Sequence, residues 1–508
     1  MDIDLPDAAT SSQPTRRITV TDASPYDLEQ VANTWEGVLT RHGSAGRGKV
    51  NRLIFVAHSS PSLCGPALTL ALTAIQQLTL DTQLYQEVFR LYRQHVNALE
   101  SGSELDPTAV AWYAGIQGNE ATLDRTWLEQ AKKEAQSGKQ KLEVELKGYT
   151  TNLIKESIRM GYRDLARFQY KCGELQDAVK SYTKSREYCT TSQHVLDMCL
   201  GVIEIALDMS NYAFVRNYVV KAESAVDAAQ SANGNKSKPA QVLLPGMVAP
   251  AQDPLEAAKE RERKIVQERL TIAGGVAHLG SGAFDKAARA FTDVGTEALN
   301  AGTSHFIPSA DIALYATFTS LACFDRGQLR SRVLENSQLR PFLDLEPYLR
   351  DIARAFYDSK FKHGLELLSR YEHRPLLDVH LAPHVPTLLR LIRQRALLAY
   401  FQPFASVSIA RMAAAFGTEP QALEPELIEL IEQGFLQAKI DSAQGTLVAN
   451  KKDARVTAFK NALEEGEKLH KKAIASQLRM KLLQNDVIVK APRSNQQKQQ
   501  PQPQQQQA

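Results

Sequence analysis

Long apolar segments and paired cysteines are both missing from the sequence, and each absence narrows the class of protein. Apolar runs such as 66–75 are too short and too interrupted to cross a bilayer. The five cysteines are an odd number without a CxxC pair, which favours reduced, buried thiols in the cytosol or nucleus. The acidic, polar N-terminus does not resemble a secretory signal. We therefore expect no association with a membrane.

A strong charge of either sign is also missing. Charged residues make up 23% of the 508, and the formal net charge is only +3. No overall field therefore favours nucleic acid as a partner.

Motifs for catalysis are scarce. The eleven histidines include no HxH and no HExxH, and no G-x-S-x-G is present, so neither a zinc site nor a hydrolase elbow is indicated. Residues 43–49 fit the phosphate-binding pattern G-x-x-x-x-G-K, but Val50 replaces the Ser or Thr that would hold magnesium, and a helix rather than a strand precedes them. We predict no catalytic residue, metal, cofactor or small-molecule substrate. A nucleotide-dependent enzyme that requires Lys49 is a disfavoured alternative.

Helical periodicity dominates from Tyr26 to about residue 406. A step of one small residue, one variable residue and one apolar residue precedes an amphipathic segment five times, beginning at Gly173, Ser210, Gly282, Gly327 and Ser359. Such spacing predicts stacked helix pairs with tight turns at the small residues, a degenerate TPR-like arm. An irregular helical domain with coincidental turns is the alternative.

Residues 407–450 have the order of a winged helix: a short strand, a helix, a turn at Gly417, a second helix and two strands. A DNA-binding version needs Lys or Arg on its second helix to contact phosphates and bases. Residues 412–437 contain five Glu and neither Lys nor Arg. The module is therefore predicted to bind protein, and a nucleic-acid-binding winged helix is an unlikely alternative.

Two helical surfaces are candidates for partner binding. A helix over 453–484 has an apolar face that could dock on its own domain or join helices of other chains. Its members are Val456, Phe459, Leu463, Ile474, Leu478 and Leu482. A possible partner-binding basic face, most simply a solvated one, consists of Lys155, Arg159, Arg163 and Arg167.

With helical repeats leading into a winged helix, the chain resembles the PCI family. Its members are scaffold subunits of the proteasome lid, the COP-nine signalosome and translation initiation factor three. Segments 149–191, 403–442 and 455–493 carry the resemblance. The first is similar to a repeat domain shared by signalosome and lid subunits, and the other two are most similar to a signalosome subunit.

The resemblance implies a mainly α fold and a non-catalytic scaffold for a complex that removes a ubiquitin-like modifier from cullins. The zinc site of that complex belongs to a different subunit. Implied partners are other PCI and MPN subunits and cullin-RING ligases, in the nucleus and cytoplasm. The equivalent proteasome-lid subunit is the alternative within the family.

Winged helices of this family lie side by side, and their C-terminal helices form a common bundle. We therefore expect partner contacts along the edges of the wing strands and along the apolar face of the last helix. The predicted wing contacts are Ala438, Ile440, Asp441, Leu447 and Val448.

The sequence predicts seven segments along the chain. They are a disordered segment 1–24, N-terminal repeats 25–230, an exposed loop 231–256, further repeats 257–376, the winged helix 377–450, a C-terminal helix 451–490 and a disordered Gln-rich tail 491–508.

Overall fold

The computed structural model describes residues 47–61, 63–101, 113, 122–234, 254–297, 307–450, 454–485 and 487. The predicted terminal segments 1–24 and 491–508 lie outside these ranges. The chain divides into two compact units, Met1–Pro403 with Ala413–Glu419, and Phe404–Met412 with Pro420–Ala508. Among the described helices, none combines the length and the apolar character that a membrane crossing requires.

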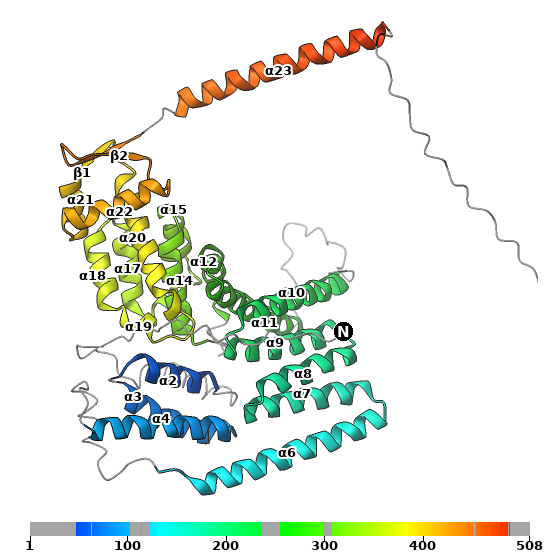
Figure 1. Cartoon of the computed structure of the whole chain (residues 1–508). Coiled ribbons are helices and arrows are strands. Elements are labelled where there is room, and N and C mark those ends of the chain that lie inside the picture. Colours follow the sequence, from blue (N-terminus) through cyan, green and yellow to red (C-terminus); the bar gives the residue numbers. More distant parts are fainter. Residues whose placement is uncertain are drawn as a thin grey trace, which may run out of the picture. The chain divides into compact units, whose positions relative to one another are not determined.

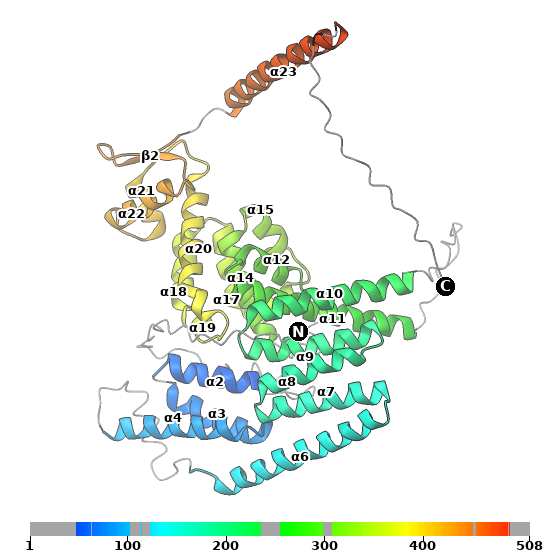
Figure 2. The ribbon, with the colours of Figure 1, turned by 45° about the vertical axis from the view of Figure 1, so that its right-hand side comes forward.

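The described part of the first unit is built from helices (Figure 1). Those before residue 235 are α2 (Arg47–Ser59), α3 (Cys64–Leu78), α4 (Thr82–Glu100), α6 (Arg125–Thr151), α7 (Lys155–Cys172), α8 (Leu175–Ser185), η1 (Arg186–Tyr188), α9 (Ser192–Asp208) and α10 (Tyr212–Gly234). Those that follow are α11 (Pro254–Gly280), α12 (Phe284–Thr292), α14 (Ser309–Cys323), α15 (Arg326–Leu329), η2 (Arg330–Leu334), α16 (Arg340–Leu343), α17 (Pro347–Tyr357), α18 (Phe361–Arg370), α19 (His373–Leu376), η3 (Ala382–His384) and α20 (Val385–Phe401). Consecutive helices from α6 to α11 lie side by side in Figures 1 and 2.

Four of the five predicted turns share one backbone geometry. Gly173, Ser210, Gly282 and Ser359 each follow a helix with a positive φ, of 90°, 54°, 76° and 62°. In each turn this residue donates its N–H to the carbonyl three residues earlier, and the next residue donates to the carbonyl five residues earlier. This is the Schellman motif, which ends one helix and turns the chain into the next. It joins α7 to α8, α9 to α10, α11 to α12 and α17 to α18.

The fifth predicted turn is wrong. Gly327 lies inside α15 and its φ is not positive. Asp325 and Gln328 form a capping box around this short helix, so the local sequence starts a helix here rather than ending one.

One apolar core runs through most of the first unit. It extends from Ala166 on α7 through Ile203 on α9 and Tyr315 on α14 to Ile392 on α20. A second cluster joins α2, α3 and α4 with Leu128 of α6. Because each helix pair buries its apolar face only against its neighbours, the stack is stable as an array rather than as separate pairs.

The predicted loop 231–256 is shorter in the structure. Helix α10 continues to Gly234, and α11 begins at Pro254, where proline suits the first turn because no hydrogen bond is lost. Residues 235–253 lie outside the described ranges.

The second unit contains a small antiparallel sheet and the last helix. Its elements are β1 (Ser406–Ser408), α21 (Ile409–Phe416, divided between the units), α22 (Pro420–Glu432), β2 (Ala438–Asp441), β3 (Thr446–Ala449) and α23 (Ala454–Gln484). The strand order is β1-β3-β2, with Val407 and Ile440 both opposite Leu447. The predicted fold class, a helical repeat arm followed by a winged helix and a C-terminal helix, is confirmed.

Candidate protein-interaction surfaces

The second helix of the winged helix, α22, has an acidic outer face. Leu423, Leu427 and Leu430 are buried, while Glu424 and Glu432 are exposed. The helix carries no Lys or Arg that could bind phosphate. A nucleic-acid backbone would therefore meet like charge here.

The five predicted wing contacts differ in exposure. Strand β3 is central in the sheet, so both of its sides are paired, and Leu447 is fully buried. Leu447 therefore packs the core and does not fit a surface role. Val448 is 42% exposed on the same strand, Ala438 is buried, and Ile440 and Asp441 are half-buried on β2. The outer side of β2, with no further strand beside it among the described residues, is the edge to which a neighbour could add.

Asp441 shapes the wing turn. Its carboxylate accepts hydrogen bonds from the backbone N–H groups of Ala443 at 3.1 Å and Gln444 at 3.4 Å. The turn is an Asx turn, for which an aspartate side chain is well suited.

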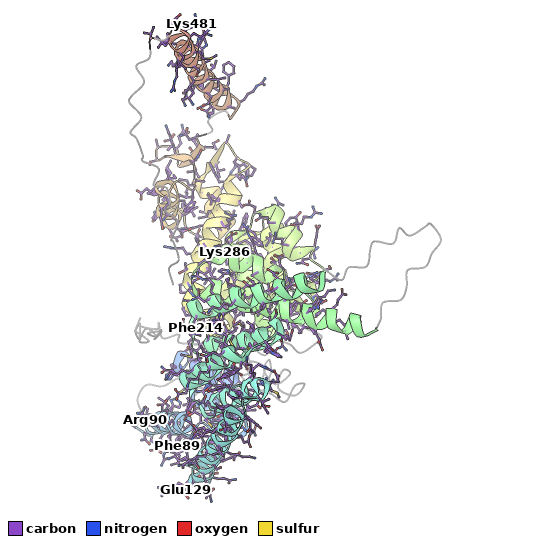
Figure 3. The ribbon with its side chains drawn as sticks, turned by 90° about the vertical axis from the view of Figure 1, so that its right-hand side faces the viewer. Phe89, Arg90, Glu129, Phe214, Lys286 and Lys481 are labelled. Carbon is purple, nitrogen blue, oxygen red and sulfur yellow. The ribbon has the colours of Figure 1, made fainter. Side chains whose placement is uncertain are left out.

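Helix α23 is exposed along its described length, from Arg455 to Gln484. Its side chains, among them Lys481, stand out from the helix in Figure 3. The six predicted apolar residues, Val456, Phe459, Leu463, Ile474, Leu478 and Leu482, are between 37% and 65% exposed. An apolar row of this length on an exposed helix is typical of a protein-binding surface.

A second apolar row on α23 was missed by the sequence reasoning. Leu469, Met480 and Leu483 are 71%, 62% and 50% exposed. At about 100° per residue, Leu469 and Met480 lie roughly 120° around the helix from Leu463 and Ile474 respectively. Their spacing of eleven and three residues matches the helical period, so this second row could have been predicted from the sequence.

The predicted basic face of α7 is largely neutralised. Arg159 is buried and pairs with Glu156 at 2.5 Å, one turn earlier. Arg163 is half-buried and lies 3.3 Å from Asp164. These two arginines are therefore unsuited to bind an acidic partner surface, because each charge is already matched on its own helix.

The two remaining members of that face lie in different surroundings. Arg167 interacts with the side chain of Tyr182 and with the carboxylate of Glu204, and it lowers the pKa of both against the larger opposing effect of burial. Lys155, at the first position of α7, is exposed. The four residues therefore do not form one cationic surface.

A buried polar cluster joins α2 to distant parts of its unit. Asp311 of α14 lies 2.6 Å from Arg52 of α2 and 2.9 Å from Arg374 of α19, and all three side chains are at most 4% exposed. Tyr315 donates to Asp378 at 2.7 Å beside this group. The first pair joins residues 259 positions apart, so no local pattern in the sequence indicates it.

A cavity of about 50 Å³ lies next to this cluster, lined by Asn51, Tyr170, Glu204 and Asp208 among others. Burial raises the pKa of Glu204 to about 7 and that of Asp208 to about 6. Tyr170 donates to Asp208 at 2.5 Å. The space suits water rather than a nucleotide, because small-molecule sites usually enclose several hundred Å³ or more.

Residues 43–49, which fit the pattern of a phosphate-binding loop, are helical where the structure describes them. Gly48 and Lys49 belong to α2, and Val50 is fully buried in the α2–α4 core. Residues 43–46 lie outside the described ranges. The described residues contain no group of three or more His, Cys, Asp or Glu side chains that could hold a metal.

Two family models match this chain. Residues 124–332 match the family model described as 26S proteasome subunit RPN7, and residues 368–451 match the PCI domain. COP9 signalosome complex subunit 1 of Arabidopsis thaliana is 35% identical over 92% of this chain and 92% of its own length. Subunit 1b of Drosophila melanogaster is 33% identical over 97% of this chain and 91% of its own.

The 26S proteasome non-ATPase regulatory subunit 6 of Caenorhabditis elegans is more distant, at 23% identity over 68% of this chain and 77% of its own length. The two signalosome subunits from Arabidopsis thaliana and Drosophila melanogaster are therefore more similar to this chain and align over more of it. The chain belongs to the family of COP9 signalosome complex subunit 1.

Proposed function

We propose that this chain is a non-catalytic scaffold subunit of the COP-nine signalosome. In this role it supports assembly of the complex that removes the ubiquitin-like modifier from cullins, and so contributes to the regulation of cullin-RING ubiquitin ligases. Its partners in this proposal are other PCI and MPN subunits, together with cullin-RING ligases, in the nucleus and cytoplasm.

The exposed helix α23 is the observation that carries the proposal. Leaving large apolar side chains in water costs about 25 cal/mol for each Å² that a partner could cover. Two apolar rows about 120° apart favour contact with more than one neighbouring helix, as in a bundle, over a single two-stranded seam. The predicted contacts Val456, Phe459, Leu463, Ile474, Leu478 and Leu482 make up the first row, and Leu469, Met480 and Leu483 the second.

The winged helix supports the same role at a second surface. The outer side of β2 is suited to pairing with a neighbouring winged helix, and Val448 adds an exposed apolar side chain on the sheet. The acidic face of α22 favours a protein partner over nucleic acid. In this proposal the chain consists of the predicted domains in the predicted order. The repeat arm leads into the winged helix, which makes lateral contacts, and the last helix joins the bundle.

A scaffold role is also consistent with the polar groups inside the first unit. The most enclosed carboxylates are engaged by arginines, tyrosine or backbone amides that hold helices together. These contacts have a structural role in the packing of α2, α14 and α19, and this role requires no catalytic reaction. The proteasome-lid role is the second candidate, since the lid relatives share the repeat and PCI segments at lower identity.

Affinity purification from the native lysate tests the proposal, with the full-length chain compared with a version ending at Asn450. We expect signalosome subunits and cullins with the full chain and their loss with the shortened one. If proteasome-lid subunits co-purified instead, the chain would be assigned to the proteasome lid. Purification of the full chain alone, or with nucleic acid that salt removes, would contradict the scaffold role.

A further inference from the structure

The turn between α6 and α7 has a backbone conformation that its sequence does not favour. Leu153 has a φ of 53°, in the left-handed region. For a residue with a Cβ this conformation costs roughly 1–2 kcal/mol. The other non-glycine residues with positive φ in the described ranges are Ser210 and Ser359, both small and both in helix-ending Schellman turns.

Burial does not offset this cost. Leu153 is 79% exposed, the following Ile154 is 52% exposed, and Tyr149 on the last turn of α6 is 37% exposed. Large apolar side chains gain stability by leaving water, and Leu153 gains almost none. A strained leucine directed into solvent is therefore unexplained by folding, and strain of this kind collects at binding sites.

The structure beneath the turn is closely packed. A Cβ at Gly161 of α7 would lie 3.0 Å from Cδ1 of Leu146 and 3.3 Å from Cδ2 of Tyr149, so glycine permits the close approach of α6 and α7. Leu146 and Ile158 are buried directly below the turn in a small cluster of their own. The apolar residues are thus presented by a fixed support, which lowers the entropy lost on binding.

The charge around the turn favours an acidic partner. Lys147 and Lys155, on either side of it, are exposed, and neither forms an ion pair with a described residue. Glu156, the nearest acid on α7, is engaged by Arg159. Helix α6 ends and α7 starts at this turn, so the negative end of one helix and the positive end of the other largely offset, and the charge that favours an acidic partner comes from the two lysines.

We infer that Tyr149, Leu153 and Ile154, together with Lys147 and Lys155, form a docking point for a segment of a partner protein in which apolar side chains stand beside Asp or Glu. This tip surface lies at the end of the α6–α7 pair that is remote from α2–α4 in Figures 1 and 2. It belongs to the first unit, whereas α23 and the wing belong to the second. The inference therefore holds whichever complex the chain joins.

Site-specific photocrosslinking in the full-length chain tests this inference. A benzophenone amino acid is placed at Ile154 and, as a control, at Leu345, which is 50% exposed elsewhere in the same unit. We expect a discrete protein crosslink from position 154 that is at least tenfold stronger than from 345. Mass spectrometry should map it to a segment with apolar residues beside Asp or Glu.

The substitution Leu153→Gly separates binding from folding. Glycine accepts the left-handed conformation, so the melting temperature should stay the same or rise, while the crosslink from position 154 should fall at least tenfold. Lys155→Glu should weaken the crosslink by repelling the acidic segment. Co-purification of subunits through α23 serves as an independent readout of assembly.

Four results would overturn the inference. Crosslinking from position 154 could be no stronger than from 345, or it could map to a Lys- and Arg-rich segment. Leu153→Gly could lower the melting temperature or leave the crosslink unchanged, which would assign Leu153 a purely structural role or none.

Discussion

At the scale of single residues, the connection of α2 to the rest of its unit depends strongly on Asp311. This carboxylate is 1% exposed and pairs with both Arg52 and Arg374. Burial by itself would raise the pKa of Asp311, but attraction to the two arginines outweighs it and holds this pKa below its usual value. Removing the negative charge would leave two buried cations without their main partner.

We predict that Asp311→Asn lowers the free energy of unfolding by about 3–5 kcal/mol at neutral pH, as expected when one partner of a buried ion pair is lost. Because the folded pKa is lowered, the contribution of Asp311 is present above the unfolded pKa and is lost as pH falls through the folded one. The difference between variant and parent should therefore shrink below about pH 4. Urea unfolding followed by circular dichroism at pH 7 and pH 3.5 measures both effects.

Asp344→Asn is the matched control for that substitution. Asp344 forms an exposed pair with Arg350 at 3.6 Å, and such surface pairs contribute about 0–1 kcal/mol. If the two variants lost equal stability at pH 7, the buried cluster would not be what holds α2 in place.

At the scale of elements, the repeat arm depends on turns that only certain residues tolerate. Gly173 has a φ of 90°, and a Cβ there would clash with the carboxylate of Asp81, which caps α4 and pairs with Arg47. Gly327 has no positive φ and has open space at the position of a Cβ. The same sequence pattern predicted a turn at both glycines, but only Gly173 has a backbone conformation and surroundings that require glycine.

We predict that Gly173→Ala destabilises the protein by about 2 kcal/mol or more, since it adds backbone strain to a clash. Gly327→Ala should be neutral or should stabilise by up to about 1 kcal/mol, because alanine suits a helix better than glycine. Thermal unfolding of both variants measures these changes in stability. A larger loss of stability for Gly327→Ala than for Gly173→Ala would contradict the assignment of the turns.

The elements that the sequence predicted correctly are those encoded by neighbouring residues. Small residues at helix ends, the order of strands and helices in the winged helix and the absence of Lys and Arg from α22 are all local signals. The order of the sheet depends on non-local pairing: β3 lies between β1 and β2, so neither of its edges is free for a partner strand. The side chain of Leu447 is on the buried face of β3, whereas that of Val448 on the same strand is exposed. Arg159 likewise looked like a surface residue because the packing that buries its side chain could not be read from helical spacing.

At the scale of the whole molecule, the sequence could not predict the cluster around Asp311, because it joins residues from α2, α14 and α19. It could predict that the chain has a repeat arm, a winged helix and a last helix with an apolar face. These three parts, together with the family to which the chain belongs, support assembly rather than catalysis. We propose that α23 binds other subunits through its apolar rows.

The most direct test of that claim compares two double variants of α23 by native mass spectrometry of the purified complex. One is Leu463→Asp with Leu478→Asp, in the first apolar row. The control is Lys468→Asp with Arg479→Asp, which changes more charge on the same helix and lies on the face between the two rows. We predict that the leucine variant is recovered without partner subunits while the control variant assembles like the parent. Assembly of the leucine variant at the parent's mass and yield would contradict it.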